Sequence, residues 1–556
     1  RTLWKGYPMA TNDAASPGHY LRWLAMVIVL YHILIVGNLL AALGYFVPEQ
    51  VHHAISLAAA LVPLFITVGA RGKKHGAGGR RKLTPFDVLL ILSVLVSSGY
   101  VVFLHDEILA YSMYGYLDTT GIVLVLMLCL PLFEAVRRAT GWALPTLVTV
   151  LILTTVFQPY LPGILHGRGY DPDRLLYSAY VGEAGIFGLP LGVAAEIILV
   201  FLLFGALMDV SGTGQWFLKL ALALTGWARG GPAKAAVVAS AMFGSISGSP
   251  SANAATTGVF TIPLMKQIGY RASFAGAVEA VASTGGQILP PVMGAIAFIM
   301  AEWIGRTYVK VVFAALVPAL LYFLVVFVSV HLQARRDGLK ALPRADLPRF
   351  GAVFREGWFY LIPIAALIYF LIVEGFPPGM AGILTLPFVI ASSFLSKERK
   401  FCLSLASFGQ ACEQSVRSWI TIAAITGFVG IMIDAVELSG IGIKIFEFIL
   451  DLSQGDLYLT LLLVGISSLI LGMGLDAIPA YITLATLMAP ADQAGRIRHG
   501  GAPVRRLLGA GVVLHAAGLH PPFTSPPRLA AAVCEKPAWR RCGSASPRSS
   551  CRSPSF

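Results

Sequence analysis

Two short runs of small polar residues interrupt apolar sequence between residues 244 and 291. The first, 244–253, reads Gly-Ser-Ile-Ser-Gly-Ser-Pro-Ser-Ala-Asn, and the second, 283–291, reads Ser-Thr-Gly-Gly-Gln-Ile-Leu-Pro-Pro. Both are poor helix-forming sequences, yet the apolar residues around them place them at bilayer depth. Non-helical backbone is tolerated there only where protein buries it or where it lines a cavity. Two such breaks between apolar helices are suited to holding a polar solute in the middle of a membrane.

The chemistry of such a break follows from the helix ends that it creates. A helix that starts there presents free N–H groups and a partial positive charge, which suit a carboxylate. A helix that ends there presents free carbonyls, which suit Na⁺, as do Ser and Thr hydroxyls. We therefore predict substrate and ion ligands among the small and polar residues of both runs, namely Ser245, Ser247, Gly248, Ser249, Ser251, Asn253, Thr256, Ser283, Thr284, Gly285, Gly286, Gln287, Pro290 and Pro291.

The backbone at these positions is expected to matter as much as the side chains. Pro290 and Pro291 lack a backbone N–H, so carbonyls upstream of them should lose their helical donors and face the cavity. The glycines allow tight turns and close approach. Close helix packing is the competing interpretation of the Ser/Gly run, and the second break favours a site.

Three carboxylates fall inside or near apolar segments, where ionisable groups are functional candidates. Glu279 lies one to two turns before the second break. It either tunes an ion site or carries a proton, or else it makes a structural hydrogen bond. Asp209 and Asp434 lie near the ends of apolar segments, so we expect them to be solvated helix caps.

The amino-acid composition is that of a polytopic membrane protein. Of 556 residues, 56% are hydrophobic and 12% are charged, against about 25% charged residues in soluble domains. Residues 492–556 contain ten Lys or Arg and two Asp or Glu, so much of the formal net charge of +13 lies there. The other basic residues cluster in short loops, as membrane orientation requires, which argues against nucleic-acid binding.

Apolar stretches of about 20 residues cross a bilayer. Such spans are predicted near 21–46, 51–70, 85–104, 119–136, 140–160, 188–210, 272–303, 309–331, 357–375, 380–395 and 414–437. Two further segments, 232–268 and 456–490, are interrupted by Gly, Ser and Pro, which predicts re-entrant helical hairpins. The predicted fold is an all-α polytopic membrane protein with about 11 transmembrane helices and two hairpins.

Charge orients these spans. Basic loops follow the second, fourth, eighth and tenth spans, at 71–82, Arg137 and Arg138, 335–355 and 397–400. Counting spans places all of them on one side, which predicts a cytoplasmic side with the N-terminus on it. We expect a multi-pass protein of the bacterial inner membrane.

The chain also contains an internal repeat. Each unit holds a Gly-to-Gly stretch with a central Asp, an amphipathic stretch, a polar break and a proline: 205–212, 217–227, 244–253 and Pro263, then 430–440, 443–452, 472–476 and Pro490. The preceding spans run in opposite senses, so the repeat is inverted, which points to a transport site. Gly472, Gly474 and Asp476 are the matching candidates in the second unit. Chance similarity is less favoured because the order of features agrees.

Apolar patterning stops at Ala491. The segment 492–556 is rich in Arg, Gly, Pro, Ser and His. The repeat predicts another polar break and a final span here. We hypothesise a disrupted reading frame after about residue 491, and the alternative is a genuine disordered basic tail.

These residues resemble the membrane component of TRAP transporters (tripartite ATP-independent periplasmic transporters). The resemblance covers about 20–490 and is strongest over 184–192, 244–253, 279–302 and 471–490. It is nearest to fused permeases of the type associated with TAXI binding proteins, in which the small subunit and the DctM-like large subunit form one chain. It implies elevator-type carriers of the ion-transporter superfamily. The implied regions are a small-subunit-like part at 1–160, a periplasmic connector at 161–187, a first large-subunit repeat at 188–330 with hairpin 232–268, connecting helices at 331–400, a second repeat at 401–491 with incomplete hairpin 456–490, and an aberrant tail at 492–556.

The resemblance implies import of a small organic anion of the carboxylate or amino acid class. A periplasmic binding protein would deliver it, and a Na⁺ or H⁺ gradient, with Na⁺ as the expected coupling ion, would drive it without a cofactor or an ATPase. One alternative is a stand-alone ion-coupled dicarboxylate carrier of the same superfamily. Another is a membrane enzyme, which needs a catalytic cluster. The histidines are dispersed, with His52, His53 and His105 expected in short loops, and neither a Walker motif nor zinc-ligand spacing occurs in the sequence.

Overall fold

The computed structural model describes residues 19–69, 83–339, 341–343, 347–454, 456–472 and 477–488. In these ranges the chain is almost entirely helical, which confirms the prediction of an all-α polytopic membrane protein. By length and composition, seven of the described helical segments can cross a membrane: Glu49–Thr67, Pro85–Phe103, Thr119–Thr140, Leu189–Val210, Tyr308–Arg336, Phe350–Val373 and Leu405–Ser439. Three other predicted spans fall on shorter apolar helices, Leu21–Val36, Ala143–Val156 and Pro378–Ser393.

The first third of the chain forms a helical bundle. Its helices are α1 (His19–Val36), α2 (Leu39–Ala42), α3 (Glu49–Thr67), α4 (Pro85–Phe103), α5 (His105–Tyr114), α6 (Thr119–Thr140), α7 (Ala143–Val156) and α8 (Pro172–Val181). The first apolar segment, predicted as one span over 21–46, is broken. Asn38 adopts a left-handed conformation with φ 55°, which a continuous right-handed helix cannot accommodate.

Arg138 forms a buried ion pair that links α6 to α4 inside this bundle. Its Nη1 lies 2.7 Å from Asp87 Oδ1 of α4, and both side chains are fully buried. Its Nε also donates to Glu134 at 2.7 Å. The expectation that Arg137 and Arg138 are loop charges is therefore wrong. Both belong to the last turn of α6, because ion pairs with Glu134 and Asp87 let the helix continue past its apolar part.

The prediction for His52 and His53 is also wrong. His52 and His53 lie inside α3 and are buried, rather than in a loop. The His53 ring contacts a glycine of a neighbouring helix: a Cβ on Gly192 would lie 2.9 Å from His53 Nε2. His53 Nδ1 donates to the carbonyl of Phe187 at 2.6 Å, so this side chain joins α3 to the segment that follows α8.

The rest of the described chain consists of α9 (Leu189–Val193), a π-helical turn (Ala194–Ile198), α10 (Leu199–Val210), α11 (Thr213–Thr225), α12 (Gly231–Ser247), α13 (Pro250–Gln267), α14 (Ala272–Gly285), α15 (Ala295–Ile304), α16 (Tyr308–Arg336), α17 (Phe350–Gly357), α18 (Leu361–Ile368), a second π-helical turn (Tyr369–Val373), α19 (Pro378–Ser393), α20 (Leu405–Ser439), α21 (Ile441–Leu452), α22 (Leu457–Gly472) and α23 (Ala477–Met488). Helix α20 contacts the first bundle through α1, α3, α6 and α7, and also packs on α10. It is therefore the central element between the two parts of the chain.

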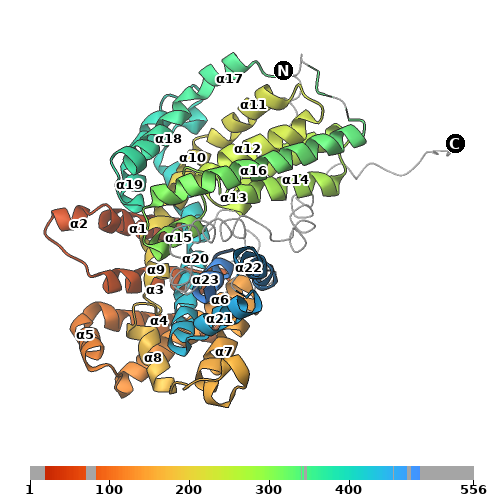
Figure 1. Ribbon diagram of the computed structural model, residues 1–556. Helices are drawn as coiled ribbons and strands as arrows, with labels where there is room; N and C mark the ends of the chain where they lie inside the picture. The colour runs from red at the N-terminus through yellow and green to blue at the C-terminus, as the bar shows by residue number, and fades with distance from the viewer. Residues whose placement is uncertain are drawn as a thin grey trace, which may run out of the picture.

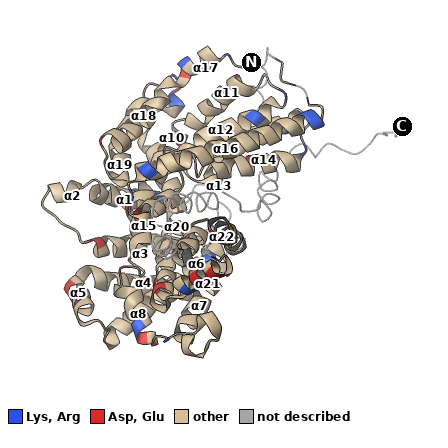
Figure 2. Cartoon of the chain, in the orientation of Figure 1, with Lys and Arg blue, Asp and Glu red and all other residues tan. Residues whose placement is uncertain are grey.

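Helices α12, α13, α14 and α16 lie together in one layer (Figure 1). They enclose a small hydrophobic core of their own, which includes Val237, Met265, Val278 and Val330. The large core that runs through α1, α3, α10 and α20 is a second cluster, which also includes Phe243 and Ile246 of α12. Lys and Arg occur at both ends of α16 (Figure 2), while most of that helix is apolar.

The order of elements repeats. Helix α10 is followed by Gly212 in a left-handed conformation and then by α11, and α20 is followed by left-handed Gly440 and then by α21. A hairpin of two helices comes next in each case, α12 with α13 and α22 with α23. Each glycine supplies the positive φ that reverses the chain at the end of the long helix.

Candidate functional site

The first polar run forms the tip of the α12–α13 hairpin. Helix α12 ends at Gly248, which has φ 58°, a conformation that glycine adopts without a Cβ penalty. Ser249 then caps α13, accepting a hydrogen bond from Ala252 N at 3.4 Å, and Pro250 occupies the first helical position. The sequence Gly-Ser-Pro therefore encodes a helix stop, a cap and a restart within three residues.

The second run separates α14 from α15. Helix α14 ends at Gly285 and α15 begins at Ala295, so the span predicted as continuous over 272–303 is interrupted. Between them Gly294 N donates to Gln287 O at 2.7 Å, closing a compact loop. Pro290 and Pro291 lie inside this loop, so the prolines predicted to interrupt the helix fall within the interruption.

The two breaks contact each other directly. Val292 N of the second break donates to Ser245 O near the hairpin tip at 3.0 Å. A Cβ on Gly244 would lie 2.5 Å from Gly286 Cα, so the two backbones touch where neither residue has a side chain. Gly248 likewise lies against the carbonyl of Met293. The structure therefore brings together the two runs that the sequence singled out.

The expectation that carbonyls upstream of the prolines face an open cavity is wrong at two positions, because Gln287 O accepts from Gly294 N and Gly286 O accepts from Leu289 N. Carbonyls at and after the prolines are occupied as well. The Tyr308 hydroxyl of α16 lies 2.9 Å from Pro291 O and 2.5 Å from Val292 O. Ser245 O accepts from Val292. Sequence reasoning missed Tyr308 because it lies 17 residues beyond Pro291 and carries no motif of its own.

The predicted hydroxyl ligands differ in their hydrogen bonding. Ser245 and Thr284 donate to backbone carbonyls of their own helices, Met242 O at 2.9 Å and Ala280 O at 2.8 Å. Ser249 and Ser251 share a hydrogen bond of 3.2 Å at the exposed tip. In the described part of the chain, the buried hydroxyl of Ser247 has no hydrogen-bond partner. Ser247 is therefore the strongest side-chain candidate for an ion or substrate ligand.

Asn253 and Thr256 have structural contacts. Asn253 is fully buried and its Nδ2 donates to Ser240 O at 2.8 Å, tying α13 to α12. Thr256 hydrogen-bonds the carboxylate of Asp209, as does Gln414 of α20. Gln287 packs its side chain on Gly294.

Glu279 is the centre of a buried hydroxyl cluster. Its carboxylate accepts from Ser240 at 3.0 Å, Thr261 at 2.5 Å and Ser283 at 3.3 Å, and also from Thr257. These hydroxyls come from α12, α13 and α14, so a single carboxylate joins the hairpin to the helix before the second break. Thr257 and Thr261 were not predicted, although their spacing of four residues places both on one face of α13.

Asp434 is not a solvated cap, contrary to expectation. It lies inside α20, is buried, and accepts from the hydroxyl of Ser178 of α8. Its other oxygen, Oδ2, is buried without a hydrogen-bond partner in the described residues. Asp209, its counterpart in the repeat, is instead bonded to Thr256 and Gln414. The sequence misjudged Asp434 because α20 continues to Ser439 before ending.

The second hairpin is described in part. Gly472 is the last residue of α22, while Gly474 and Asp476 lie outside the described residues. Helix α23 packs on α20, where Thr483 Oγ1 lies 3.3 Å from Met432 Sδ. In the described residues no group of three His, Cys, Asp or Glu side chains is placed to hold a metal ion.

We expect Ser247→Ala to leave the stability of the fold unchanged within about 1 kcal/mol, because it removes a buried hydroxyl that bonds nothing. Transport should nevertheless fall if this hydroxyl is a ligand. Thermal unfolding in detergent and uptake into proteoliposomes measure the two effects. Ser211→Ala is the matched control, since the Ser211 hydroxyl is buried but donates to Leu207 O at 2.7 Å. Equal uptake by both variants would exclude Ser247 as a ligand.

Comparison with known proteins gives one family match and several relatives. Residues 124–545 match the family model described as the DctM component of tripartite ATP-independent periplasmic transporters. A C4-dicarboxylate TRAP transporter large permease protein, DctM, from Pseudomonas aeruginosa is 34% identical over 170 residues, which are 30% of this chain and 39% of the relative.

Two relatives with other names match longer segments. The sialic acid TRAP transporter permease protein SiaT of Haemophilus influenzae is 25% identical over 302 residues, or 52% of this chain and 46% of the relative. The isethionate TRAP transporter permease protein DctMQ of Oleidesulfovibrio alaskensis is 26% identical over 320 residues, or 56% of this chain and 48% of the relative. The chain thus spans less than half the length of each of these three relatives.

Proposed function

Because the chain belongs to the DctM family of TRAP transporter permeases, we propose that it is the membrane permease of a binding-protein-dependent secondary transporter for small organic anions. The family consists of transporters rather than enzymes. The relatives support the substrate class, since their names refer to a C4-dicarboxylate, sialic acid and isethionate, each an organic acid or its anion.

The contact between the two breaks is the observation that carries the proposal. Gly244 meets Gly286, and Val292 N bonds Ser245 O, so a helix end, a helix start and an irregular loop converge. Irregular backbone and helix termini of this kind are what transporters use to bind anions and cations at mid-membrane. The unpartnered hydroxyl of Ser247 adds an oxygen ligand at the same place.

The coupling ion and the partner are part of the proposal. Na⁺ is the proposed coupling ion, because the breaks offer hydroxyl and carbonyl oxygens, which suit a hard cation. Work with a periplasmic substrate-binding protein is a general property of the family, and we propose such a partner here. The proposed location is the inner membrane, with a cytoplasmic N-terminus supported by the basic loops.

We also propose that the chain combines a small subunit with the large one. The family match begins at residue 124, and α1, α3 and α4 precede it and pack with α6 and α20. For residues 492–556 the proposal remains a disrupted reading frame, although the family match extends to residue 545. Resequencing the gene tests this, and an intact frame would refute it.

Uptake into proteoliposomes tests the function. Labelled dicarboxylates, sialic acid and isethionate are offered with an inward Na⁺ gradient, with and without the secreted binding protein encoded beside the gene. Uptake that needs both Na⁺ and the binding protein is the expected result. Uptake without the binding protein would instead identify a stand-alone carrier. Uptake driven by a proton gradient alone would show that H⁺, rather than Na⁺, is the coupling ion.

A further inference from the structure

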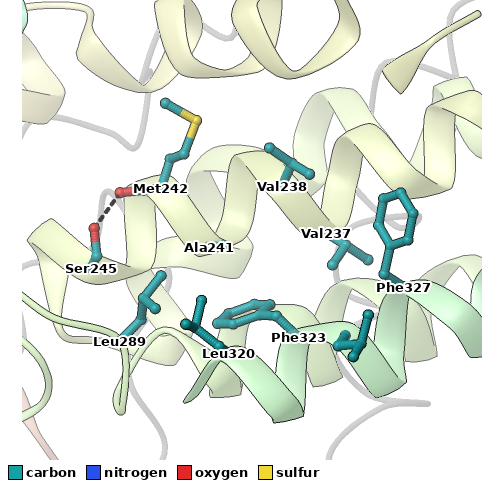
Figure 3. Close-up of a pocket in the computed structure, with 10 residues that line it drawn as sticks. Val237, Val238, Ala241, Met242, Ser245, Leu289, Leu320, Phe323 and Phe327 are labelled. Atoms are coloured by element: carbon teal, nitrogen blue, oxygen red, sulfur yellow. Dashed lines mark hydrogen bonds between the residues drawn. The ribbon is translucent and has the colours of Figure 1, made fainter. Parts of the chain in front are cut away.

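A groove of about 430 Å³ lies between α12 and α16 (Figure 3). Val237, Val238 and Ala241 line it from α12, and Leu320, Phe323 and Phe327 line it from α16. Its volume falls in the range of ligand sites, about 300–1,000 Å³. The polar residue in the lining, Ser245, already donates its hydroxyl to Met242 O. The groove therefore offers apolar contact rather than polar recognition.

The groove opens toward the outside of the helical layer. Leu320 and Leu324, on its α16 side, are 57% and 56% exposed. The most apolar 18-residue stretch of α16 has a mean hydropathy of 2.8, and only 17% of this stretch is buried in the protein. A helix so apolar and so exposed faces hydrocarbon, so the occupant must come from the bilayer.

Positive charge gathers at one end of this groove. Lys234 Nζ lies 5.2 Å from the centre of the Phe327 ring, which lines the groove, and 3.0 Å from His331 Nδ1. Lys234 is 4% exposed. Arg229 and Arg335 lie close enough to act electrostatically on His331, together with Lys234.

Lys234 lacks a carboxylate partner in the described part of the chain. Among the described residues Lys234 forms no ion pair; its recorded partners are His331 and Phe327. The acidic residue that follows α16, Asp337, accepts two hydrogen bonds from Gln333 at 2.9 Å. A buried ammonium without a counter-ion is costly, so this end of the groove favours an anion.

We propose that the groove binds one anionic phospholipid, with an acyl chain between α12 and α16 and its phosphate beside Lys234. The apolar lining matches the chain, and the cluster of Lys234, Arg229 and Arg335 matches the headgroup. Basic pockets between helices on the cytoplasmic side select anionic lipids in this way, and the predicted orientation places the Arg335 loop on that side.

The other end of the groove reaches the two breaks. Ser245 belongs to the hairpin tip and Leu289 to the loop before α15, and both line the groove. A bound acyl chain therefore contacts one residue of each break, Ser245 and Leu289. An effect of the lipid on transport rests on the proposed function, but lipid binding does not.

Native mass spectrometry of the full chain in detergent tests binding. The purified protein is titrated with phosphatidylglycerol or with phosphatidylcholine of the same acyl chains. We expect one retained phosphatidylglycerol, bound about fivefold more tightly than phosphatidylcholine, because one cation beside an anionic headgroup contributes about that factor. Lys234→Met should abolish the preference, whereas Lys310→Met, at the opposite exposed end of α16, should keep it.

Two further measurements separate the tail from the headgroup. Ala241→Phe fills the groove and should reduce retention at least fivefold, whereas Ala314→Phe, on an exposed face of α16, should not. A phosphatidylglycerol with a photoreactive acyl chain should label peptides of α12 and α16 in the unaltered protein, which needs no variant to fold.

Specific results would overturn the proposal. Equal retention of the two lipids would remove the headgroup site. Labelling outside α12 and α16, or equal retention by the Ala241 and Ala314 variants, would remove the groove. Full displacement of the lipid by inorganic phosphate would show that the tail is not bound. None of these results depends on transport, so they are distinguishable from failure of the proposed function.

Discussion

Replacing Glu279 by Leu should destabilise the protein by roughly 2–6 kcal/mol. The Glu279 carboxylate is the recorded acceptor for Thr261 and Ser283. Each of these buried hydroxyls would lose its partner, at about 1–3 kcal/mol per group. The free-energy cost at Thr257 would be smaller, because its hydroxyl also donates to Asn253 O at 2.8 Å. Thermal unfolding in detergent, monitored by tryptophan fluorescence, measures the loss.

Glu279→Gln separates the hydrogen bonds from the charge. The amide keeps one acceptor oxygen and offers an NH₂ group that a rotated hydroxyl can accept, so we expect a loss of only about 1 kcal/mol. Glu302→Leu, at an exposed position of α15, is the control for the same change of side chain and should stay within about 0.5 kcal/mol. If the Leu and Gln variants of Glu279 unfold at one temperature, the hydroxyl cluster does not hold the hairpin.

Gly244→Ala should separate the two breaks and remove transport. The new Cβ would lie 2.5 Å from Gly286 Cα and 2.8 Å from Asn253 Nδ2. The first of these atoms is backbone, so relief requires movement of a helix or of the loop. Overpacking of this kind costs about 1–3 kcal/mol, and the displaced loop would break the bond from Val292 N to Ser245 O. Thermal unfolding and uptake report on the two effects.

Gly99→Ala is the control for Gly244→Ala, because it makes the same substitution in a helix where the new Cβ causes no clash. Gly99 lies within α4, and a Cβ there meets nothing within 4 Å. Alanine should therefore stabilise the helix by up to about 1 kcal/mol. Gly286→Ala creates the same clash from the other side, so the double variant should cost less than the two single changes together. Strict additivity would mean that Gly244 and Gly286 do not touch in the membrane.

The sequence indicated the helical class and the positions of both breaks because these depend on local chemistry. A helix ends before Gly248 and a new one begins after Ser249, at Pro250. These preferences are local and do not depend on tertiary packing. The same reasoning failed at Asn38, whose left-handed backbone ends α1 early, and at Arg138, whose partner Asp87 lies 51 residues away.

The contacts that complete the site are long-range and carry little sequence signal. Tyr308 reaches the second break from α16, and Thr257 and Thr261 meet Glu279 from another helix. Asp434 was misjudged because its burial depends on α8 packing over α20 at Ser178. Local patterns locate a break in a helix, whereas packing decides which of its atoms remain free to bind.

The hairpin layer has a small core of its own and also contributes Phe243 and Ile246 of α12 to the large core, and it meets the α10–α20 part where Gly205 of α10 faces Ser247 of α12. A Cβ on Gly205 would lie 3.2 Å from Ser247 Cα, so the two helices approach closely at this point. At Gly205 and Ser247 the two backbones thus fit together without a side chain on the α10 side, so a Cβ there would act as a wedge between the hairpin layer and the α10–α20 part.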